Sequence, residues 1–358
     1  MWAAFGSRVV KSPAAPPEDH VMDRGGRKTR GSGWRPVLAA MLGIAGASAA
    51  VLLARAVLAP PDQPVRLAIN TWVGYEFAVL ARELGYYEEE GAHVRLLELT
   101  SLGDVRRAYE RGQADGMFGT TIELVRSRGS GRDPVPVLVA DFSLGADVII
   151  ANEPVSQLAD LRGMRIGVET GTLGMYVLMR ALDSCGLSWQ DVQVMHIPHT
   201  SQAAAMETGE IDAVVTFPPN STELLAEGSR AVIFSSADIP GEVVDLLSVD
   251  AKVLDERRRE IDRVLRAYFR ALAYAESHPQ EASRIMSERL GISSAEVLRL
   301  LETEVRIVGP REQGEYIGPD GKIRAIIGRT ELMLDGPSAL PVEQTPDPRH
   351  ADAMRGDG

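Results

Sequence analysis

The residues of this sequence that could bind a small molecule follow or interrupt stretches with the pattern of β-strands. They combine aromatic rings, hydroxyl groups and carboxylates, namely Trp72, Tyr75, Thr120, Thr121, Asp147, Glu169, Thr170, Thr172, Thr216, Phe217 and Asp245. Rings can form a wall against a ligand, and hydroxyls and carboxylates can hydrogen-bond to it. Catalytic chemistry is not evident in this set. We therefore predict non-covalent binding of a small molecule, with no catalytic residue and no cofactor.

Each of these residues also has an ordinary structural explanation. Trp72 and Tyr75 could pack within a lobe, and Thr120 and Thr121 could cap a helix. Asp147 could form a hinge hydrogen bond. Asp245 interrupts an apolar run, so it needs a ligand, an arginine or a hydrogen-bond partner if it is buried.

The segment from Arg165 to Tyr176 changes from a strand pattern to a helix pattern. Residues 165–168 alternate polar and apolar, and one helical face then recurs at Met175, Leu178, Met179 and Leu182. Between them lies a Gly- and Thr-rich turn. The N–H groups of such a helix N-terminus favour an anion or a strong acceptor. A capped turn in any α/β domain has the same pattern, and the lysine of a Walker loop is absent.

Short strand patterns alternate with helix patterns from Val65 to about Phe234, and helices dominate afterwards. Among the later helices, Arg257–Ser277 is strongly amphipathic, and Ser293 with Glu296 predicts a capping box. This order indicates an α/β fold. Ligands bind at the carboxyl ends of strands in open α/β sheets, so we expect the loops to form a polar pocket with an aromatic wall.

The two ends of the chain differ from its middle. Residues 1–35 and 337–358 have compositions typical of disorder, and 60–64 is a Pro-rich linker. Residues 36–59 form an apolar run preceded by arginines and a lysine. This run predicts export, either as an uncleaved transmembrane anchor or as a cleaved signal peptide.

Composition excludes several functions. The net charge of -12 argues against nucleic acid as a partner. The single cysteine, Cys185, cannot build a disulfide framework or a cysteine metal site. The six histidines form no H-x-x-x-H pair, so we predict no metal site. His196 and His199 are interpreted as ordinary surface residues.

A series of short segments in fixed order carries a family resemblance. It consists of Trp72-Val73-Gly74-Tyr75, Gly112-Gln113-Ala114-Asp115, Gly119-Thr120-Thr121, Ser143-Leu144-Gly145-Ala146-Asp147, Asp160-Leu161-Arg162-Gly163, Arg165-Ile166-Gly167, Glu169-Thr170-Gly171-Thr172, Asp212-Ala213-Val214-Val215-Thr216 and Ile239-Pro240-Gly241. The series resembles the periplasmic substrate-binding proteins of nitrate-, sulfonate- and taurine-type ABC importers. Their superfamily includes the thiamine pyrimidine synthases. The resemblance covers about Val65 to Leu334.

The resemblance implies a two-lobed type II periplasmic-binding-protein fold with two hinge crossings. We expect lobe 1 at 65–147 and 249–336, lobe 2 at 148–248, and crossings near Val148–Ala151 and Leu246–Asp250. It further implies a monomer at the periplasmic face of the bacterial inner membrane. This monomer would capture a small molecule and deliver it to a permease coupled to an ATPase.

The charges around the expected pocket bear on the ligand. Carboxylates lie in or near its mouth, at Glu76, Asp141, Asp147, Glu169 and Asp245. The five loops expected to form it contain no arginine or lysine; they are 72–75, 119–121, 141–147, 169–172 and 216–219. A neutral or cationic, partly aromatic ligand is therefore at least as compatible as nitrate or a sulfonate. Two other functions stay open: a membrane-anchored ligand-sensing domain, and an enzyme resembling the pyrimidine synthases. The lone cysteine and the export segment argue against the enzyme.

Overall fold

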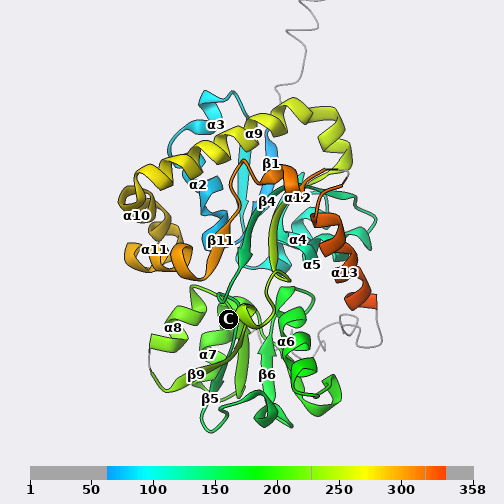
Figure 1. Ribbon diagram of the computed structural model, residues 1–358, viewed down its shortest axis with the longest axis vertical. Coiled ribbons are helices and arrows are strands. Elements are labelled where there is room, and N and C mark those ends of the chain that lie inside the picture. The colour runs from blue at the N-terminus through cyan, green and yellow to red at the C-terminus, as the bar shows by residue number, and fades with distance from the viewer. Residues whose placement is uncertain (1–62, 227, 319, 336–358) are drawn as a thin grey trace, which may run out of the picture. The chain divides into compact units, whose positions relative to one another are not determined.

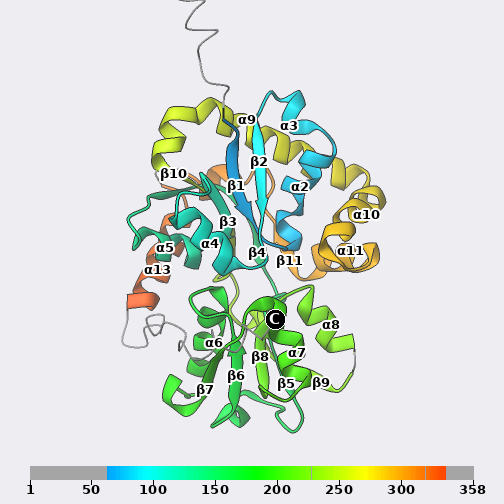
Figure 2. The same cartoon turned by 180° about the vertical axis from the view of Figure 1, so that it is seen from behind.

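The computed structural model describes residues 63–226, 228–318 and 320–335. This part of the chain contains two β-sheets, each with helices on both faces (Figures 1 and 2). The predictions for 1–35, 36–59 and 337–358, and for most of the 60–64 linker, lie outside the described residues. Among the described helices, none has the length and apolarity that crossing a membrane requires.

The first sheet has six strands in the order β11-β4-β10-β3-β1-β2. Their bounds are β1 Val65–Ile69, β2 Val94–Glu98, β3 Gly116–Thr120, β4 Pro134–Ser143, β10 Val244–Asp250 and β11 Val305–Ile307. Strand β1 runs parallel to β2 and β3, whereas β10 is antiparallel to both β3 and β4. The carboxyl ends of β1 and β3 therefore lie at the same edge of the sheet, beside the amino end of β10.

The second sheet has five strands in the order β7-β6-β8-β5-β9. Their bounds are β5 Val148–Asn152, β6 Arg165–Val168, β7 Gln193–His196, β8 Ala213–Thr216 and β9 Arg230–Ser235. Strand β6 is parallel to β7 and β8, and β5 is antiparallel to β8 and β9. Both sheets thus combine parallel strands with antiparallel ones, since β11 is also antiparallel to β4 in the first sheet, and this confirms the predicted α/β fold class.

Helices cover both faces of the first sheet. Successive side chains of a strand point to opposite faces, and in this sheet buried apolar side chains lie on both. The helices of this region are α2 Glu76–Glu83, α3 Tyr86–Glu89, α4 Leu102–Glu110, α5 Thr121–Arg128, α9 Ala251–Ser277, α10 Pro279–Leu290, α11 Ser294–Thr303, α12 Gln313–Tyr316 and α13 Ile323–Asp335. Leu67 and Ile69 of β1 share an apolar cluster with α2, α9, α10 and α11. Ala68, which lies between them, packs instead with Val105 and Tyr109 of α4.

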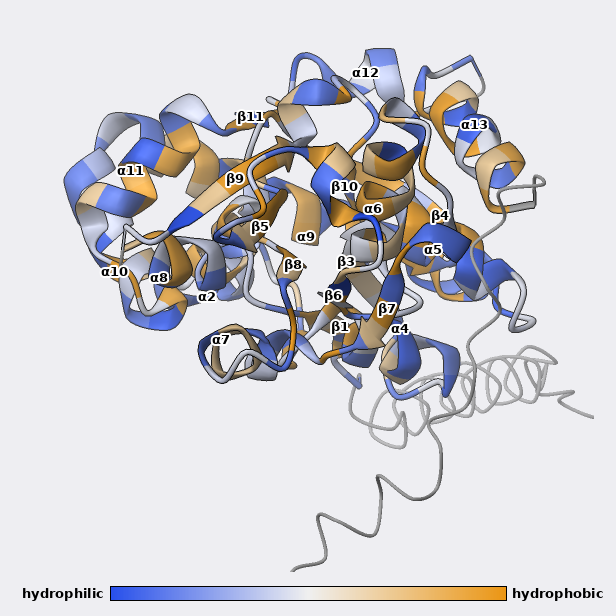
Figure 3. Ribbon diagram, turned by 90° about the horizontal axis from the view of Figure 1, so that it is seen from below, coloured by the Kyte–Doolittle hydropathy of each residue, from blue (hydrophilic) through white to orange (hydrophobic). Residues whose placement is uncertain are grey.

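The second sheet repeats this alternation with its own helices. These are α6 Leu173–Ser184, α7 Gln202–Glu207 and α8 Asn220–Ala226. Ile149 of β5 belongs to the cluster that contains α6, and its neighbour Ile150 belongs to the cluster that contains α7 and α8. The outer helices carry both kinds of residue: α11 and α13 alternate between hydrophilic and hydrophobic segments in Figure 3.

Several helix predictions are confirmed. The predicted face of α6 is buried at all four positions, Met175, Leu178, Met179 and Leu182. Ser293 caps α11 by accepting the N–H of Glu296, which confirms one half of the predicted capping box. The Glu296 carboxylate bonds to Arg299 and Thr222 instead of returning to Ser293. Helix α9 begins six residues before its predicted start, at Ala251, and has non-helical backbone angles at Arg257, where the amphipathic pattern begins.

The two links between the sheets differ from the predicted crossings. The first sheet's β4 ends at Ser143 and the second sheet's β5 begins at Val148, so the first link is 144–147. The whole of β10 pairs with β3 and β4, so the predicted boundary at Ser248 falls inside a strand of the first sheet and is wrong there. The second link is 236–243. The division into two lobes that move about these links stays a prediction.

Candidate ligand-binding site

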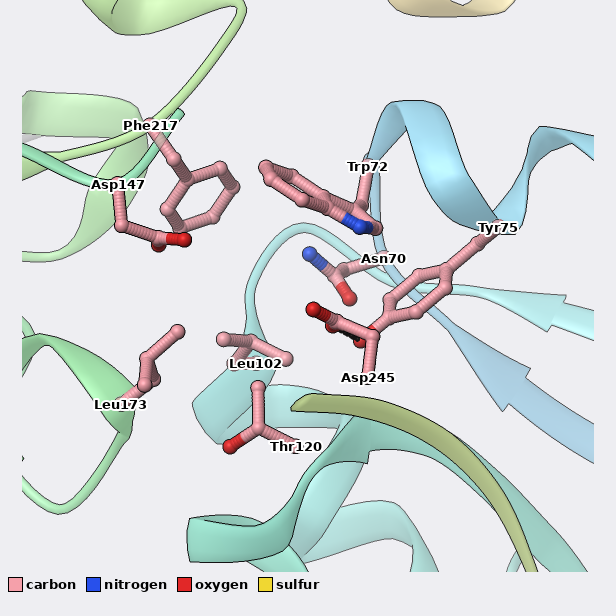
Figure 4. A pocket seen from close by; sticks show the side chains of 9 residues that line it. All are labelled: Asn70, Trp72, Tyr75, Leu102, Thr120, Asp147, Leu173, Phe217 and Asp245. Carbon is pink, nitrogen blue, oxygen red and sulfur yellow. Dashed lines mark hydrogen bonds between the residues drawn. The ribbon is translucent and has the colours of Figure 1, made fainter. Parts of the chain in front are cut away.

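Side chains from both sheets surround a small cavity (Figure 4). It is lined by Asn70, Trp72, Tyr75, Leu102, Thr120, Asp147, Leu173, Phe217 and Asp245. The first sheet supplies residues that follow β1 or lie in β3 and β10. The second sheet supplies Asp147 before β5, Leu173 at the start of α6 and Phe217 after β8. The space between them admits the centre of a water molecule over about 10 Å³, which is room for one water.

A second small cavity adjoins the first on the side of the second sheet. Its lining residues are Asp147, Glu169, Thr172, Gly174, His199, Gln202, Val215, Thr216 and Phe217. Asp147 and Phe217 belong to both linings, so the two cavities are neighbours separated by these side chains.

Trp72 is the centre of the aromatic wall. Its ring lies edge-on to Tyr75 and to Phe217, with centroids 6.5 and 5.8 Å away. The indole N–H points back into the first sheet and donates to both carboxylate oxygens of Asp141, at 3.4 and 3.3 Å. Phe217 in turn stacks on His199, with centroids 4.2 Å apart. The wall therefore continues from one sheet to the other.

Asp141 and Asp245 form a buried carboxyl pair beneath this wall. They lie directly opposite each other on β4 and β10, and the hydroxyl of Tyr75 donates to Asp245. Burial is the main cause that raises the pKa of Asp141 to about 7, and burial together with the Asp141 charge raises the pKa of Asp245 well above its usual value. The pair therefore holds at least one proton at neutral pH.

Several polar atoms that face these cavities are buried without a hydrogen-bond partner among the described residues. In the first cavity they are Asn70 Oδ1, Asp147 Oδ2 and Asp245 Oδ2; in the second they are His199 Nε2, Gln202 Oε1 and Thr216 Oγ1. A buried polar atom without a partner costs free energy, so such atoms are rare unless they serve a ligand or a water. Their concentration here marks a binding site.

Asp147→Asn is expected to stabilise the ligand-free chain at alkaline pH. Burial raises the pKa of Asp147 from 3.8 to about 7, with a contribution from the Glu123 charge. Between these values the folded chain keeps a proton that the unfolded chain loses, so the wild type loses stability as pH rises from about 4 to about 7. Asparagine has no proton to lose. Urea unfolding at pH 4.5 and 8 should show the variant gaining up to about 4 kcal/mol on the wild type at pH 8.

Asp212→Asn is the matched control because its expected effect has the opposite sign. A hydrogen bond from Arg165 lowers the pKa of Asp212, so its carboxylate stabilises the fold at neutral pH. This variant should be less stable than the wild type at pH 8, and the difference should shrink as pH falls below 4. An unchanged pH profile in Asp147→Asn would contradict the burial argument.

Two glutamates connect the sheets by binding helix N-termini across the cavity. Glu123 of α5 accepts the N–H of Leu173, the first residue of α6, at 2.9 Å. Glu169, which follows β6, accepts from the Ser101 hydroxyl at 2.6 Å and from the Gly103 N–H at 3.2 Å, at the start of α4. Each sheet thus places a carboxylate on a helix N-terminus that belongs to the other sheet, where the helix dipole stabilises negative charge.

The structure brings most of the predicted ligand residues together. Nine of them line the two cavities: Trp72, Tyr75, Thr120, Asp147, Glu169, Thr172, Thr216, Phe217 and Asp245. Their role in binding stays a prediction. The Thr120 hydroxyl caps α5 and donates to Glu123 at 2.6 Å, so this residue contributes its methyl side to the cavity (Figure 4).

Three residues differ from expectation. Thr121 accepts from the hydroxyl of Thr330 on α13, and Thr170 contacts His196; neither lines the two cavities. Each hydroxyl is hydrogen-bonded to a side chain outside the two cavity linings. His199, interpreted as a surface residue, is buried against Phe217, and burial lowers its pKa to about 4, so its ring is neutral at pH 7.

The sequence did not single out other residues of the site. The cavities are also lined by Asn70, Leu102, Leu173 and Gln202. Glu123 contributes indirectly, because it accepts the N–H of Leu173 at the start of α6. Asn70 directly follows β1, so its place after a strand was an available signal. Glu123 and Gln202 lie in helices, where position along the chain does not reveal a contact with another sheet. Among the described residues, no cluster of histidine, cysteine and carboxylate side chains is suited to a metal ion.

The profile of a known protein family matches residues 75–282 and is described as NMT1/THI5 like. This match spans more than half of the chain and includes the whole second sheet. The chain belongs to the NMT1/THI5-like family. The resemblance deduced from the ordered segments is thereby confirmed.

Known relatives of this NMT1/THI5-like chain include binding proteins. The riboflavin-binding protein RibY of Chloroflexus aurantiacus is 28% identical over 233 residues, which are 62% of this chain and 65% of that protein. The match thus spans slightly less than two thirds of the relative's length.

Solved structures share the two-sheet fold. The periplasmic aliphatic sulphonate binding protein SsuA of Escherichia coli superimposes with a TM-score of 0.63 at 20% identity, covering 76% of this chain and 92% of that one. The ligand-binding component of an ABC-type import system from Staphylococcus aureus gives 0.62 at 13% identity, covering 76% and 93%. The predicted periplasmic-binding-protein fold is confirmed.

Proposed function

We propose that this chain is the solute-binding component of an ABC importer. In this role it captures a small molecule between its two sheets and delivers it to a membrane permease coupled to an ATPase, without catalysing a reaction. We infer that the site lies outside the cytoplasmic membrane, and the periplasmic location of a binding protein with the same fold supports this. An uncleaved N-terminal anchor would tether it there.

One observation carries the proposal: unpaired buried polar atoms from both sheets line two adjoining small cavities. Asn70 and Asp245 belong to the first sheet, whereas Asp147 and Thr216 belong to the second. A ligand that bonds to these atoms would offset the cost of their burial. It would also hold the two sheets together, which is how closure around a ligand is stabilised in proteins of two hinged lobes.

The small free volume supports a closing motion. Room for one water molecule does not accommodate a metabolite, so the sheets must separate before a ligand enters. The chain crosses between the sheets only through 144–147 and 236–243 within the described residues. Two short links of this kind are the usual site of a hinge.

A thermal-shift screen of the full-length chain tests the proposal. The panel holds nitrate, taurine, alkanesulfonates, aromatic sulfonates, thiamine pyrimidines, polyamines and flavins. A ligand at 100 times its dissociation constant should stabilise the fold by about 2.7 kcal/mol, a shift of several degrees. Native mass spectrometry of the protein purified from its host identifies any ligand that the panel omits.

Two aromatic substitutions serve as variant and control. Phe217→Ala removes part of the wall at a position that is half-buried, and it should abolish most of the ligand-induced shift. Trp189→Ala removes an aromatic ring that packs on the second core and lines neither cavity, so the shift should persist. Absence of any shift and of any co-purified small molecule would refute a solute-binding role.

A further inference from the structure

We propose that the solute is a small organic cation, either a protonated amine or a protonated nitrogen heterocycle. This inference rests on the proposed solute-binding function and specifies its ligand class. It follows from the sign of the charges at the site, from the kind of unpaired atoms there, and from the occupation of both helix N-termini by carboxylates.

The ionisable side chains that face the two cavities are mainly carboxyl groups, which can carry only negative charge. Asp147, Asp245 and Glu169 lie in the linings, which contain no arginine or lysine among the described residues. The charge of Arg107 acts on Glu169, but its guanidinium is paired with Asp104 at 2.8 Å and lies in neither lining. An anionic ligand would meet no compensating positive charge in this desolvated space and would require Asp147 and Asp245 to keep their protons, whereas a cation would compensate the charge of both.

The unpaired atoms of the first cavity are all oxygens, and those of the two carboxyl groups accept hydrogen bonds when the groups are ionised. They are oxygens of Asn70, Asp147 and Asp245, and each of these residues is at most 4% exposed. The amide nitrogen of Asn70 donates to the Thr71 carbonyl, which leaves the amide oxygen for the cavity. An ammonium group supplies up to three N–H donors and a compensating charge, whereas a sulfonate or nitrate supplies only acceptors.

The helix N-termini that would attract an anion already bind carboxylates of the chain itself. The N–H of Leu173 at the start of α6 donates to Glu123, whose second oxygen accepts the N–H and the hydroxyl of Thr120. Glu169 fills the N-terminus of α4 in the same way. The Gly- and Thr-rich turn that the sequence suggests as an anion site therefore binds a carboxylate of the chain itself.

The aromatic wall completes a site for a cation. Trp72, Tyr75 and Phe217 surround the space from one side, and Asp147 and Asp245 approach it from opposite sheets (Figure 4). A cation near aromatic faces and between two carboxylates gains both cation–π and charge-assisted hydrogen-bond energy. Burial also raises the pKa of both carboxyl groups, and a bound cation would favour their charged forms.

Three probes that share a benzyl group test the sign of the ligand charge. Benzylammonium, benzyl alcohol and phenylmethanesulfonate are titrated into the full-length chain by calorimetry and by thermal shift. We expect benzylammonium to bind at least about tenfold more tightly than the other two. Asp147→Asn and Asp245→Asn should each reduce its affinity at least about tenfold while the variants stay folded.

Asp212→Asn is the matched control, because its carboxylate pairs with Arg165 outside both linings and its loss should leave the affinity unchanged. Equal or tighter binding of phenylmethanesulfonate or benzyl alcohol would overturn the inference, as would unchanged affinity in Asp147→Asn. If none of the three binds while nitrate, a sulfonate or a flavin of the wider panel does, the cation class is wrong and the solute-binding function stands. Binding of a polyamine in place of benzylammonium would support the cation class. If nothing binds at all, the proposed function itself fails.

Discussion

Arg289→Met is expected to lower the free energy of unfolding by about 3–5 kcal/mol. Arg289 of α10 bonds to three parts of the first sheet region: Glu76 of α2, Glu98 of β2 at 2.7 Å and the Asn70 carbonyl at 3.0 Å. Glu76 is fully buried, and burial raises its pKa to about 7 even with the guanidinium beside it. Without Arg289 this carboxyl group would be buried with no compensating charge. Urea unfolding at pH 7 measures the loss.

The double variant Glu76→Gln with Arg289→Met should recover most of that stability, because no charge is then left buried. Arg284→Met is the matched control on the same helix, since its pair with Glu288 is solvent-exposed. It should change stability by less than about 1 kcal/mol. A loss from Arg289→Met as small as this would show that Glu76 is stabilised by other means.

A comparison of Glu76 with Asp245 shows why the sequence located buried carboxylates but not their roles. Glu76 and Asp245 both interrupt apolar surroundings in the sequence, and both are buried in the structure. Arg289 neutralises Glu76 from 213 residues away. Asp245 has an unpaired oxygen that faces the cavity. Only the folded chain distinguishes them, since partners this distant leave no local signal.

The fold was more predictable than the site because periodicity is local. The alternation of strand and helix patterns predicted the α/β class, the family resemblance implied two lobes, and the face of α6 was predicted residue by residue. The error at β10 has a physical cause: an apolar strand has the same pattern in either sheet, and pairing with β3 and β4 decides its place.

For the site, the loops after strands were informative, but hydroxyl residues were ambiguous. Thr120 and Thr121 are adjacent, yet one caps α5 beside the cavity and the other contacts Thr330. Threonine hydroxyls bond readily to nearby backbone or side-chain groups, so their type and spacing do not predict which one faces a ligand. The link from Glu123 to α6 was not predicted for a different reason. A glutamate three residues after a helix N-cap predicts a capping box, and its second oxygen is free to reach elsewhere.

Gly74→Ala is expected to disrupt the aromatic wall and to destabilise the fold by about 3 kcal/mol or more. A Cβ atom at Gly74 would lie 1.9 Å from an oxygen of Asp141 and 2.8 Å from the indole nitrogen of Trp72. Asp141 lies in the paired strand β4, so its side chain can move only a short distance. The Trp72 ring packs edge-on against Phe217, which restricts its movement as well. The added methyl must therefore break the indole–carboxylate contact. Chemical unfolding measures the stability, and near-ultraviolet circular dichroism reports the displaced indole.

Gly328→Ala on α13 is the control, because it adds the same methyl where no atom lies within 4 Å. Alanine in a helix should be neutral or stabilising by about 0.5–1 kcal/mol. If Gly74→Ala retained wild-type stability and an unchanged indole signal, the close approach of Trp72 and Asp141 could not be required. If Gly74→Ala lost stability, the wild-type indole signal and ligand affinity together, the hydrogen bond between Trp72 and Asp141 would require glycine at position 74. The binding site above this contact would then depend on that glycine.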